Sequence, residues 1–385
     1  MRCVMDTTPM CSAWPASTPV RRAGMRPQLS ERGATGLRRL GAAGRQRAVA
    51  TVTAAWLAAL VAMPLGVAAQ GQPAAPASAS AVNSAISPAI AAATTSASAA
   101  SPARPSAGPP QSVQVPSLDR DAAGAALQQP GFWWPAADAG RPAPAIVLLH
   151  GCGGPYDRQG ALSRRMRDYA ALLHDAGLAV LVTDSLTPRH ERELCTQRLG
   201  TRQVTMTQRR RDALGALQWL AAQPGVDASR LGLMGWSNGG STVLAATGAQ
   251  RSEVQVAPVK PAFAIAFYPG CADALADGYR PVAPVLLLLG EADDWTPAEP
   301  CRLLAAAQPG VGLGAGAGAG AAPLQWQAYA GAFHGFDGTG PVVLRADVPN
   351  GVHPGQGVHV GGNPAARAAA LARLQRFLHE QGLAR

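Results

Sequence analysis

Residues 231–240 read LGLMGWSNGG, and this stretch decides the fold. An apolar run typical of a buried strand ends in a GxSxG turn at residues 235–239, and an Ala-rich segment with helical character follows. Strand, sharp turn and helix in this order are what a nucleophile elbow requires, with glycines on both sides of the serine to avoid collisions. The pattern predicts that Ser237 is a nucleophile at a helix N-terminus, where N–H groups favour negative charge. The alternative is a Gly-rich strand-to-helix turn without chemistry.

Apolar runs of β type alternate with helical stretches on both sides of this turn. Strands are expected at residues 145–149, 178–183, 230–235, 262–268, 285–289 and 324–329. Helices are expected at residues 164–176, 204–223 and 365–378, where apolar residues recur at helical spacing. In the second of these helices, Arg209–Arg211 are expected on a face opposite the apolar one. The alternation predicts an α/β protein with a mostly parallel sheet and helices on both faces, as in the α/β-hydrolase fold.

A serine hydroxyl becomes a good nucleophile only when a base takes its proton and a third group orients that base. In this fold an acid and then a histidine follow the serine along the chain. The strand at 285–289 runs into the sequence GEADDWTP, where Asp293 is the predicted acid and Asp294 is the alternative. The last strand runs into a loop that holds His334, the predicted base.

The oxyanion that develops during acyl transfer needs two backbone N–H donors. The residue after the nucleophile, Asn238, is expected to provide one of them. The loop HGCGG at residues 150–154 follows the first long strand, and by analogy with related folds Cys152 is expected to provide the other.

Three further side chains are candidates for binding substrate. Trp236 is expected to pack beside the nucleophile or to line the pocket, and Tyr156 is expected to line it. Arg189 follows the strand at 178–183 and is a candidate for binding a substrate carboxylate, although exposed arginines are common.

The net charge of +10 over 385 residues is unevenly distributed. Residues 1–69 hold nine Arg and two acidic residues, whereas the remainder holds 24 basic and 21 acidic residues, so nucleic-acid binding is not expected. Residues 48–69 carry no charge, follow several arginines and end in small residues, which predicts a signal peptide with a long basic n-region over 1–69. An uncleaved membrane anchor is the alternative, and a later start at Met25 would shorten the n-region.

The rest of the chain divides by composition. Residues 70–111 are mostly Ala, Ser, Pro and Gly and are expected to form a disordered linker. Residues 112–385 are expected to form one hydrolase domain, with a Gly-Ala repeat between 307 and 323 as a flexible surface insertion. If the leader is cleaved, the protein is expected to be periplasmic or secreted, without a stable membrane anchor.

Four cysteines lie beyond the leader: Cys152, Cys195, Cys271 and Cys301. An even number in an oxidising compartment predicts two disulfides with three possible connectivities. Proximity along the chain favours Cys152–Cys195 and Cys271–Cys301, and four buried free thiols are the alternative. The spacings do not suggest a metal site, so neither metal nor cofactor is expected.

From residue 144 to 383 the chain resembles the dienelactone hydrolase family of α/β-hydrolases. The resemblance rests on the loop at 150–154, the elbow at 235–240, the segment 290–297 and the segment 329–337. The family implies a Cys, His, Asp triad in the enzymes that open dienelactones, but Ser237 stands where that cysteine would be. Serine members resemble general ester hydrolases, so the expected substrate is a small ester or lactone, hydrolysed through an acyl-enzyme. A peptidase of the prolyl-oligopeptidase kind and a non-catalytic binding protein on a hydrolase scaffold are the alternatives.

Overall fold

The computed structural model describes residues 108–136, 140–308 and 324–384. The predicted signal peptide, nearly all of the predicted linker and most of the Gly-Ala insertion lie outside these residues.

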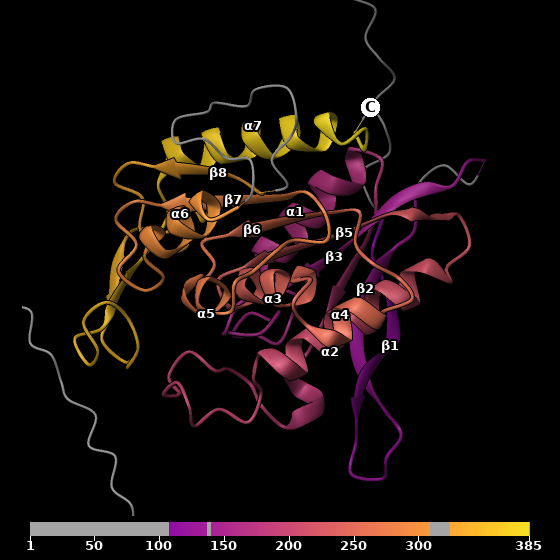
Figure 1. Ribbon diagram of the computed structural model, residues 1–385, viewed down its shortest axis with the longest axis horizontal. Helices are drawn as coiled ribbons and strands as arrows, with labels where there is room; N and C mark the ends of the chain where they lie inside the picture. Colours follow the sequence, from indigo (N-terminus) through magenta and orange to yellow (C-terminus); the bar gives the residue numbers. More distant parts are fainter. Residues whose placement is uncertain (1–107, 137–139, 309–323, 385) are drawn as a thin grey trace, which may run out of the picture. The chain divides into compact units, whose positions relative to one another are not determined.

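Eight strands form one sheet in the order β1-β2-β4-β3-β5-β6-β7-β8 (Figure 1). Their bounds are β1 (Gln111–Arg120), β2 (Ala126–Trp134), β3 (Ala143–Leu149), β4 (Ala179–Thr183), β5 (Val226–Trp236), β6 (Phe263–Phe267), β7 (Val285–Gly290) and β8 (Leu324–Tyr329). The pairings from β4 across to β8 are parallel, whereas β1 with β2 and β2 with β4 are antiparallel. This sheet confirms the predicted α/β-hydrolase fold.

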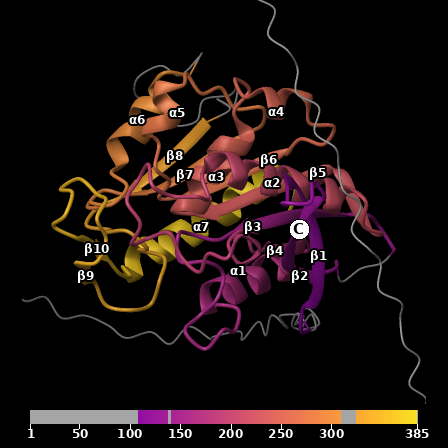
Figure 2. The ribbon, with the colours of Figure 1, turned by 90° about the horizontal axis from the view of Figure 1, so that it is seen from below.

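Helices cover both faces of the sheet (Figure 2). They are α1 (Arg164–Asp175), α2 (Met206–Ala221), α3 (Asn238–Thr247), α4 (Ser252–Val256), α5 (Ala272–Ala276), α6 (Ala298–Ala306) and α7 (Pro364–Glu380), with a 3-10 turn at Thr187–Arg189. Ile146 and Leu148 of β3 pack on the side of α1 and α7, whereas Val147 and Leu149 pack on the side of α2, α3 and α6. Alternate residues of a strand face opposite sides, so the continuous apolar runs are explained by a sheet that is covered twice.

Helix α2 begins where its sequence provides a cap. The side chain of Thr205 accepts a hydrogen bond from the backbone N–H of Thr207, and the Gln208 side chain accepts one from the backbone N–H of Thr205. This capping arrangement satisfies donors that the first turn of a helix leaves unpaired. It defines where α2 begins.

The face of α2 predicted to hold residues 209–211, away from the apolar one, is not an exposed face for two of the three. Arg209 and Arg210 are buried, at 1% and 8% exposure. Helix α2 is covered by β1 on one side and by α3 on another, so a face that looks polar in the sequence is enclosed.

Besides the short helices α4, α5 and α6, two hairpins lie outside the predicted set. The antiparallel hairpin β1–β2 extends the sheet at one edge. The segment after His334 forms a small hairpin, β9 (Val343–Arg345) with β10 (Val358–Val360), where no strand was predicted. Among the described residues, no helix is long and apolar enough to cross a membrane.

Candidate active site

The turn between β5 and α3 has the strained geometry of a nucleophile elbow. Ser237 has φ 55° and ψ −120°, in a region that side chains other than glycine rarely occupy. A Cβ atom on Gly235 would lie 2.2 Å from the carbonyl oxygen of Gly239, and one on Gly239 would lie 2.0 Å from that of Leu149. Only glycine fits at either position, so the GxSxG spacing follows from the close approach of α3 to β3 and β5.

A chain of hydrogen bonds joins the predicted nucleophile, base and acid. The Nε2 atom of His334 lies 2.9 Å from Oγ of Ser237, and its Nδ1 atom lies 2.8 Å from Oδ2 of Asp293. The imidazole is 4% exposed and the aspartate 5%. Because three loops at the carboxyl ends of β5, β7 and β8 provide these residues, the parallel sheet brings them together from positions up to 97 residues apart.

The carboxylate of Asp293 is held on its other side by backbone donors. Its Oδ1 accepts hydrogen bonds of 2.9 Å from the N–H groups of both Trp295 and Thr296. The hydroxyl of Thr296 lies 3.0 Å from Oδ2 and 3.1 Å from Nδ1 of His334. Bonds of this kind stabilise the charged carboxylate and fix its orientation toward the imidazole.

The two neighbouring aspartates have different partners. Asp294 accepts hydrogen bonds from the backbone N–H of His359 at 2.8 Å, and its Oδ2 lies 2.7 Å from Nδ1 of the same residue. Asp294 therefore ties the β9–β10 hairpin to the loop after β7, and Asp293 is the aspartate that contacts His334.

The loop 150–154 lies against the nucleophile. A Cβ atom on Gly151 would be only 3.6 Å from the Cβ of Ser237. Within the described part of the chain, the N–H groups of Cys152 and Asn238 have no protein acceptor, whereas the carbonyl of Cys152 accepts from the N–H of Leu194 at 2.7 Å. Two free backbone donors next to the serine are the arrangement that an oxyanion needs.

Two disulfides join Cys152 to Cys195 and Cys271 to Cys301. These are the pairs that proximity along the chain favours. The first attaches the loop 150–154 to the segment after the 3-10 turn, and the second attaches the start of α5 to α6.

Aromatic rings enclose the imidazole. The ring centroids of Trp295 and Tyr268 lie 4.6 and 4.7 Å from that of His334. Tyr268 has φ 36°, and its hydroxyl donates a 2.6 Å hydrogen bond to Asp337. Burial raises the pKa of Tyr268 well above its ordinary value, so this phenol stays a neutral donor.

A cavity of about 980 Å³ opens beside the loop 150–154. Tyr156, one of the candidate pocket residues, lines it together with Gly153, Asp184 and Leu186. Burial and the nearby carboxylate of Asp184 raise the pKa of Tyr156 to about 12, so its hydroxyl remains protonated.

The other two candidate substrate residues do not reach this cavity. Arg189 is instead paired with Asp119 and Asp212, at 2.9 Å in each case. Trp236 is 1% exposed, and its ring stacks on Phe267 at 5.8 Å, beside the nucleophile but inside the core. The proposal of a carboxylate-binding role for Arg189 is therefore not supported, since its guanidinium is already neutralised.

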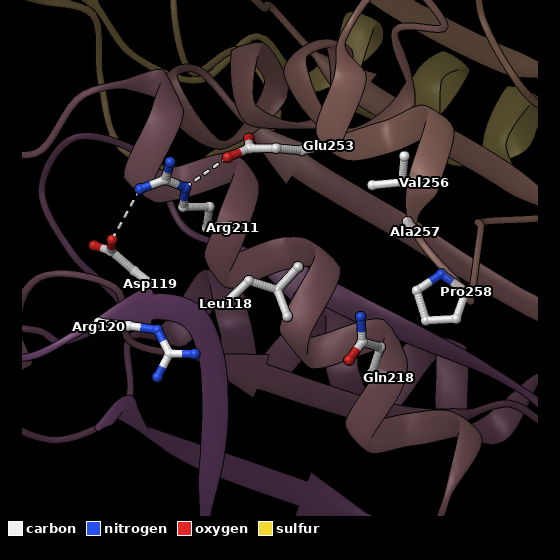
Figure 3. Close-up of a pocket in the computed structure, with 9 residues that line it drawn as sticks. All are labelled: Leu118, Asp119, Arg120, Arg211, Gln218, Glu253, Val256, Ala257 and Pro258. Carbon is white, nitrogen blue, oxygen red and sulfur yellow. Dashed lines mark hydrogen bonds and ion pairs between the residues drawn. The ribbon is translucent and has the colours of Figure 1, made fainter. Parts of the chain in front are cut away.

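A second cavity, of about 450 Å³, lies over β1, α2 and α4 (Figure 3). The close-up shows Arg211 between the carboxylates of Asp119 and Glu253, with ion pairs of 3.1 and 2.7 Å. None of the predicted site residues lines this cavity.

Sequence reasoning missed several residues around the triad, above all Thr296, Tyr268 and Trp295. Thr296 could have been found from the sequence, because an Asp followed by Thr three residues later is typical of a turn closed by side-chain hydrogen bonds. Tyr268 directly follows β6, and its approach to His334 depends on packing between strands that are not neighbours in sequence. Among residues 108–136, 140–308 and 324–384, no group of three or more His, Cys, Asp or Glu side chains could hold a metal ion.

Comparisons with known proteins agree with this architecture. Thermogutta terrifontis esterase 2, in a structure phosphorylated by paraoxon, is 17% identical and superposes with a TM-score of 0.50 over 73% of this chain and 97% of the esterase. The dienelactone hydrolase-like promiscuous phosphotriesterase P91, from metagenomic libraries, is 20% identical, with a TM-score of 0.51 over 71% of this chain and 99% of P91. No functionally curated protein matches the chain at a significant level.

These likenesses, at under 25% identity, establish the fold. The sequence profile of the dienelactone hydrolase family matches residues 134–381, which include the elbow, the loops that hold Asp293 and His334, and the loop 150–154. The chain therefore belongs to the dienelactone hydrolase family and is an esterase-like hydrolase with the α/β-hydrolase fold.

Proposed function

We propose that this protein is an exported serine hydrolase that cleaves carboxylic esters or lactones through an acyl-enzyme. The observation that carries the proposal is the unbroken hydrogen-bond chain from Ser237 through His334 to Asp293 at a strained elbow. A serine in such a chain loses its proton to the imidazole as it attacks, and the aspartate stabilises the imidazolium that forms.

The first half of the reaction forms the acyl-enzyme. Oγ of Ser237 attacks the ester carbonyl carbon while its proton passes to Nε2 of His334. The carbonyl oxygen becomes an oxyanion that the free N–H groups of Cys152 and Asn238 receive. When the tetrahedral intermediate collapses, the bond to the leaving alkoxide breaks and His334 returns the proton to it, which releases an alcohol.

The second half repeats these steps with water. His334 takes a proton from a water molecule that attacks the acyl carbon, and the same two N–H groups receive the oxyanion. Collapse breaks the bond to Oγ, which regains its proton from His334, and a carboxylic acid leaves. Apart from the substrate and this water molecule, both halves balance with groups of the protein.

The proposed substrate is a small ester or lactone other than a dienelactone, because a serine occupies the position of the cysteine that characterises dienelactone-opening relatives. The cavity beside Tyr156 is large enough for one arm of such a substrate. Export is supported by the leader pattern at residues 1–69 and by the two disulfides, which persist in oxidising compartments.

The decisive experiment is intact-mass spectrometry after treatment with a fluorophosphonate, together with turnover of p-nitrophenyl acetate. We expect one adduct on the native protein and none on Ser237→Ala or on denatured protein. Native protein that is folded yet forms no adduct and hydrolyses no ester would contradict the proposal and favour a binding protein on a hydrolase scaffold.

A further inference from the structure

Arg209 of α2 is a buried cation that lacks a carboxylate partner. It is 1% exposed, and within the described residues it takes part in no ion pair. Burial lowers its pKa to about 10, so the guanidinium remains charged at neutral pH. The carboxylates of Asp212 and Asp184 attract this charge without forming an ion pair with it, and its hydrogen bonds go to uncharged groups.

One side of the guanidinium holds the loop that carries Cys152. Its Nη2 donates a 2.6 Å hydrogen bond to the carbonyl of His150, and its Nη1 donates a 2.8 Å bond to Nε2 of the same residue. Nε2 also accepts from the backbone N–H of Ser185 at 3.2 Å, so the proton of this imidazole sits on Nδ1, which donates to the carbonyl of Gly151 at 2.7 Å. Burial and the neighbouring guanidinium hold the pKa of His150 well below its ordinary value, which keeps the ring neutral.

The other side of the guanidinium holds the helix that begins with Asn238. Its Nε donates a 3.1 Å hydrogen bond to the hydroxyl of Thr242, and that hydroxyl donates in turn to the carbonyl of Asn238 at 2.8 Å. The loop 150–154 and the first turn of α3 are in close contact, because a Cβ on Gly239 would lie 2.6 Å from the carbonyl oxygen of His150. Arg209 thus hydrogen-bonds to His150, two residues before Cys152, and to Thr242, whose hydroxyl binds the carbonyl of Asn238.

We propose that Arg209 is a positioning residue that clamps both donors of the oxyanion hole and sets a fixed positive charge behind them. The inference rests on the proposed function, since it assigns a role within the same site. Rigid donors cost no reorganisation when charge develops, and a cation in a water-excluded environment strengthens their effect. Arg209 touches neither Ser237 nor the reacting atoms and acts through His150 and Thr242.

Arg209→Met removes the charge and every hydrogen bond while keeping an unbranched apolar stem. For p-nitrophenyl acetate we expect kcat to fall about 10- to 100-fold with KM within about threefold, because the lost interactions matter mainly in the transition state. Arg209→Lys keeps the charge but loses the planar set of guanidinium donors. Its kcat should therefore lie between that of the native protein and that of Arg209→Met. The lysine variant also serves if the methionine variant does not fold.

Arg210→Met is the matched control. Arg210 is the next residue of α2, is also buried, and pairs with Glu253 at 2.6 Å, away from the loop 150–154. We expect this variant to lose thermal stability to a similar extent while its kcat stays within about twofold of the native value. A parallel loss of kcat in both variants would mean that Arg209 acts only through general stability.

Hydrogen–deuterium exchange provides a readout that does not depend on turnover. Amides in the segments 148–156 and 237–243 should exchange faster in Arg209→Met and at the native rate in Arg210→Met. A folded Arg209→Met protein with native kcat, or with native exchange in both segments, would overturn the inference. If the native protein forms no fluorophosphonate adduct, the proposed function fails, and the exchange rates alone decide whether Arg209 positions the loop.

Discussion

At the scale of single residues, two adjacent aspartates in the loop after β7 have different partners because their side chains point in different directions. Asp293 turns toward His334 and is held by the N–H groups of Trp295 and Thr296, whereas Asp294 turns toward His359. The two residues therefore provide an internal comparison for the role of the acid.

We expect Asp293→Asn to reduce kcat about 10³- to 10⁴-fold, because a neutral amide neither fixes the required tautomer of His334 nor stabilises its charged form. Asp294→Asn should change kcat by less than about threefold, since its partner His359 lies outside the triad. Initial rates with p-nitrophenyl acetate measure both. Equal losses in the two variants would refute the assignment of the acid.

The glycines of the elbow provide a second comparison at this scale. A Cβ on Gly239 would lie 2.0 Å from the backbone oxygen of Leu149, whereas one on Gly340 would meet no atom within 4 Å. We expect Gly239→Ala to destabilise the protein by about 3 kcal/mol or more, and Gly340→Ala to change stability by less than about 0.5 kcal/mol. Urea unfolding followed by circular dichroism distinguishes them, and a native midpoint for Gly239→Ala would show that the elbow can relax.

At the scale of elements, the loops above the carboxyl ends of the strands are tied to one another by covalent and polar links. The disulfide Cys152–Cys195 connects the loop after β3 to the segment after β4, and Leu194 also donates to the carbonyl of Cys152. Leu186, Leu194 and Val204 form a small apolar cluster around this disulfide, and Trp295 packs against the cluster. The segment around Cys195 is thus covalently attached to the residue that carries a predicted oxyanion donor.

Removing either disulfide should cost about 4 kcal/mol of stability, since the two loops span 43 and 30 residues and their closure entropies are nearly equal. The double variant Cys152→Ser, Cys195→Ser is also expected to lower kcat by about tenfold, because it releases the loop beside Ser237. Cys271→Ser with Cys301→Ser is the control. Thermal unfolding and kcat below the melting range measure the two effects, and equal kcat values would separate the disulfide from catalysis.

At the scale of the whole molecule, an ion-pair network joins strand β1 of the antiparallel hairpin to the 3-10 turn and to helices α2 and α4. Arg189 pairs with Asp119 of β1 and Asp212 of α2, and Arg211 pairs with Asp119 and Glu253 (Figure 3). Burial alone would raise the pKa of Asp119, but hydrogen bonds from Arg189 and Arg211 outweigh it and hold the pKa below its ordinary value. Burial would likewise raise the pKa of Glu253, but hydrogen bonds from Arg211 and Arg210 outweigh it and lower the pKa.

These lowered pKa values predict that stability falls in acid. A carboxyl group whose pKa is lower in the folded state stabilises the protein above its ordinary pKa, near 4, and loses that contribution as the pH falls through the folded value. We expect the melting temperature to drop between about pH 5 and pH 3, and to drop less steeply in Asp119→Asn, which lacks one titrating group. Calorimetry across this pH range measures the melting temperatures of both proteins. Parallel curves of melting temperature against pH for the native protein and Asp119→Asn would exclude Asp119 as a source of the acid sensitivity.

Much of the parallel part of the fold could be predicted because its signals are local. The strands β3, β4, β6 and β7 are mostly apolar runs, the elbow is a contiguous motif, and His334 lies in the loop that follows β8. The hairpin β1–β2 has a mixed exposure pattern, and the hairpin β9–β10 has only three residues in each strand, so neither produces a comparable signal. Arg209 looked like part of a polar face because the covering elements β1 and α3 come from distant positions in the sequence.

The sequence by itself determined the class of fold, the order of its parallel elements and the residue types available for a serine triad, because each depends on periodicity and spacing within short segments. Only the tertiary structure decided which aspartate contacts His334, that Arg189 is neutralised by Asp119 and Asp212, and that Arg209 hydrogen-bonds to His150 and Thr242. These outcomes depend on the distances between loops that follow different strands. Such distances are set by how helices and strands pack in three dimensions, and no single segment of the chain contains them.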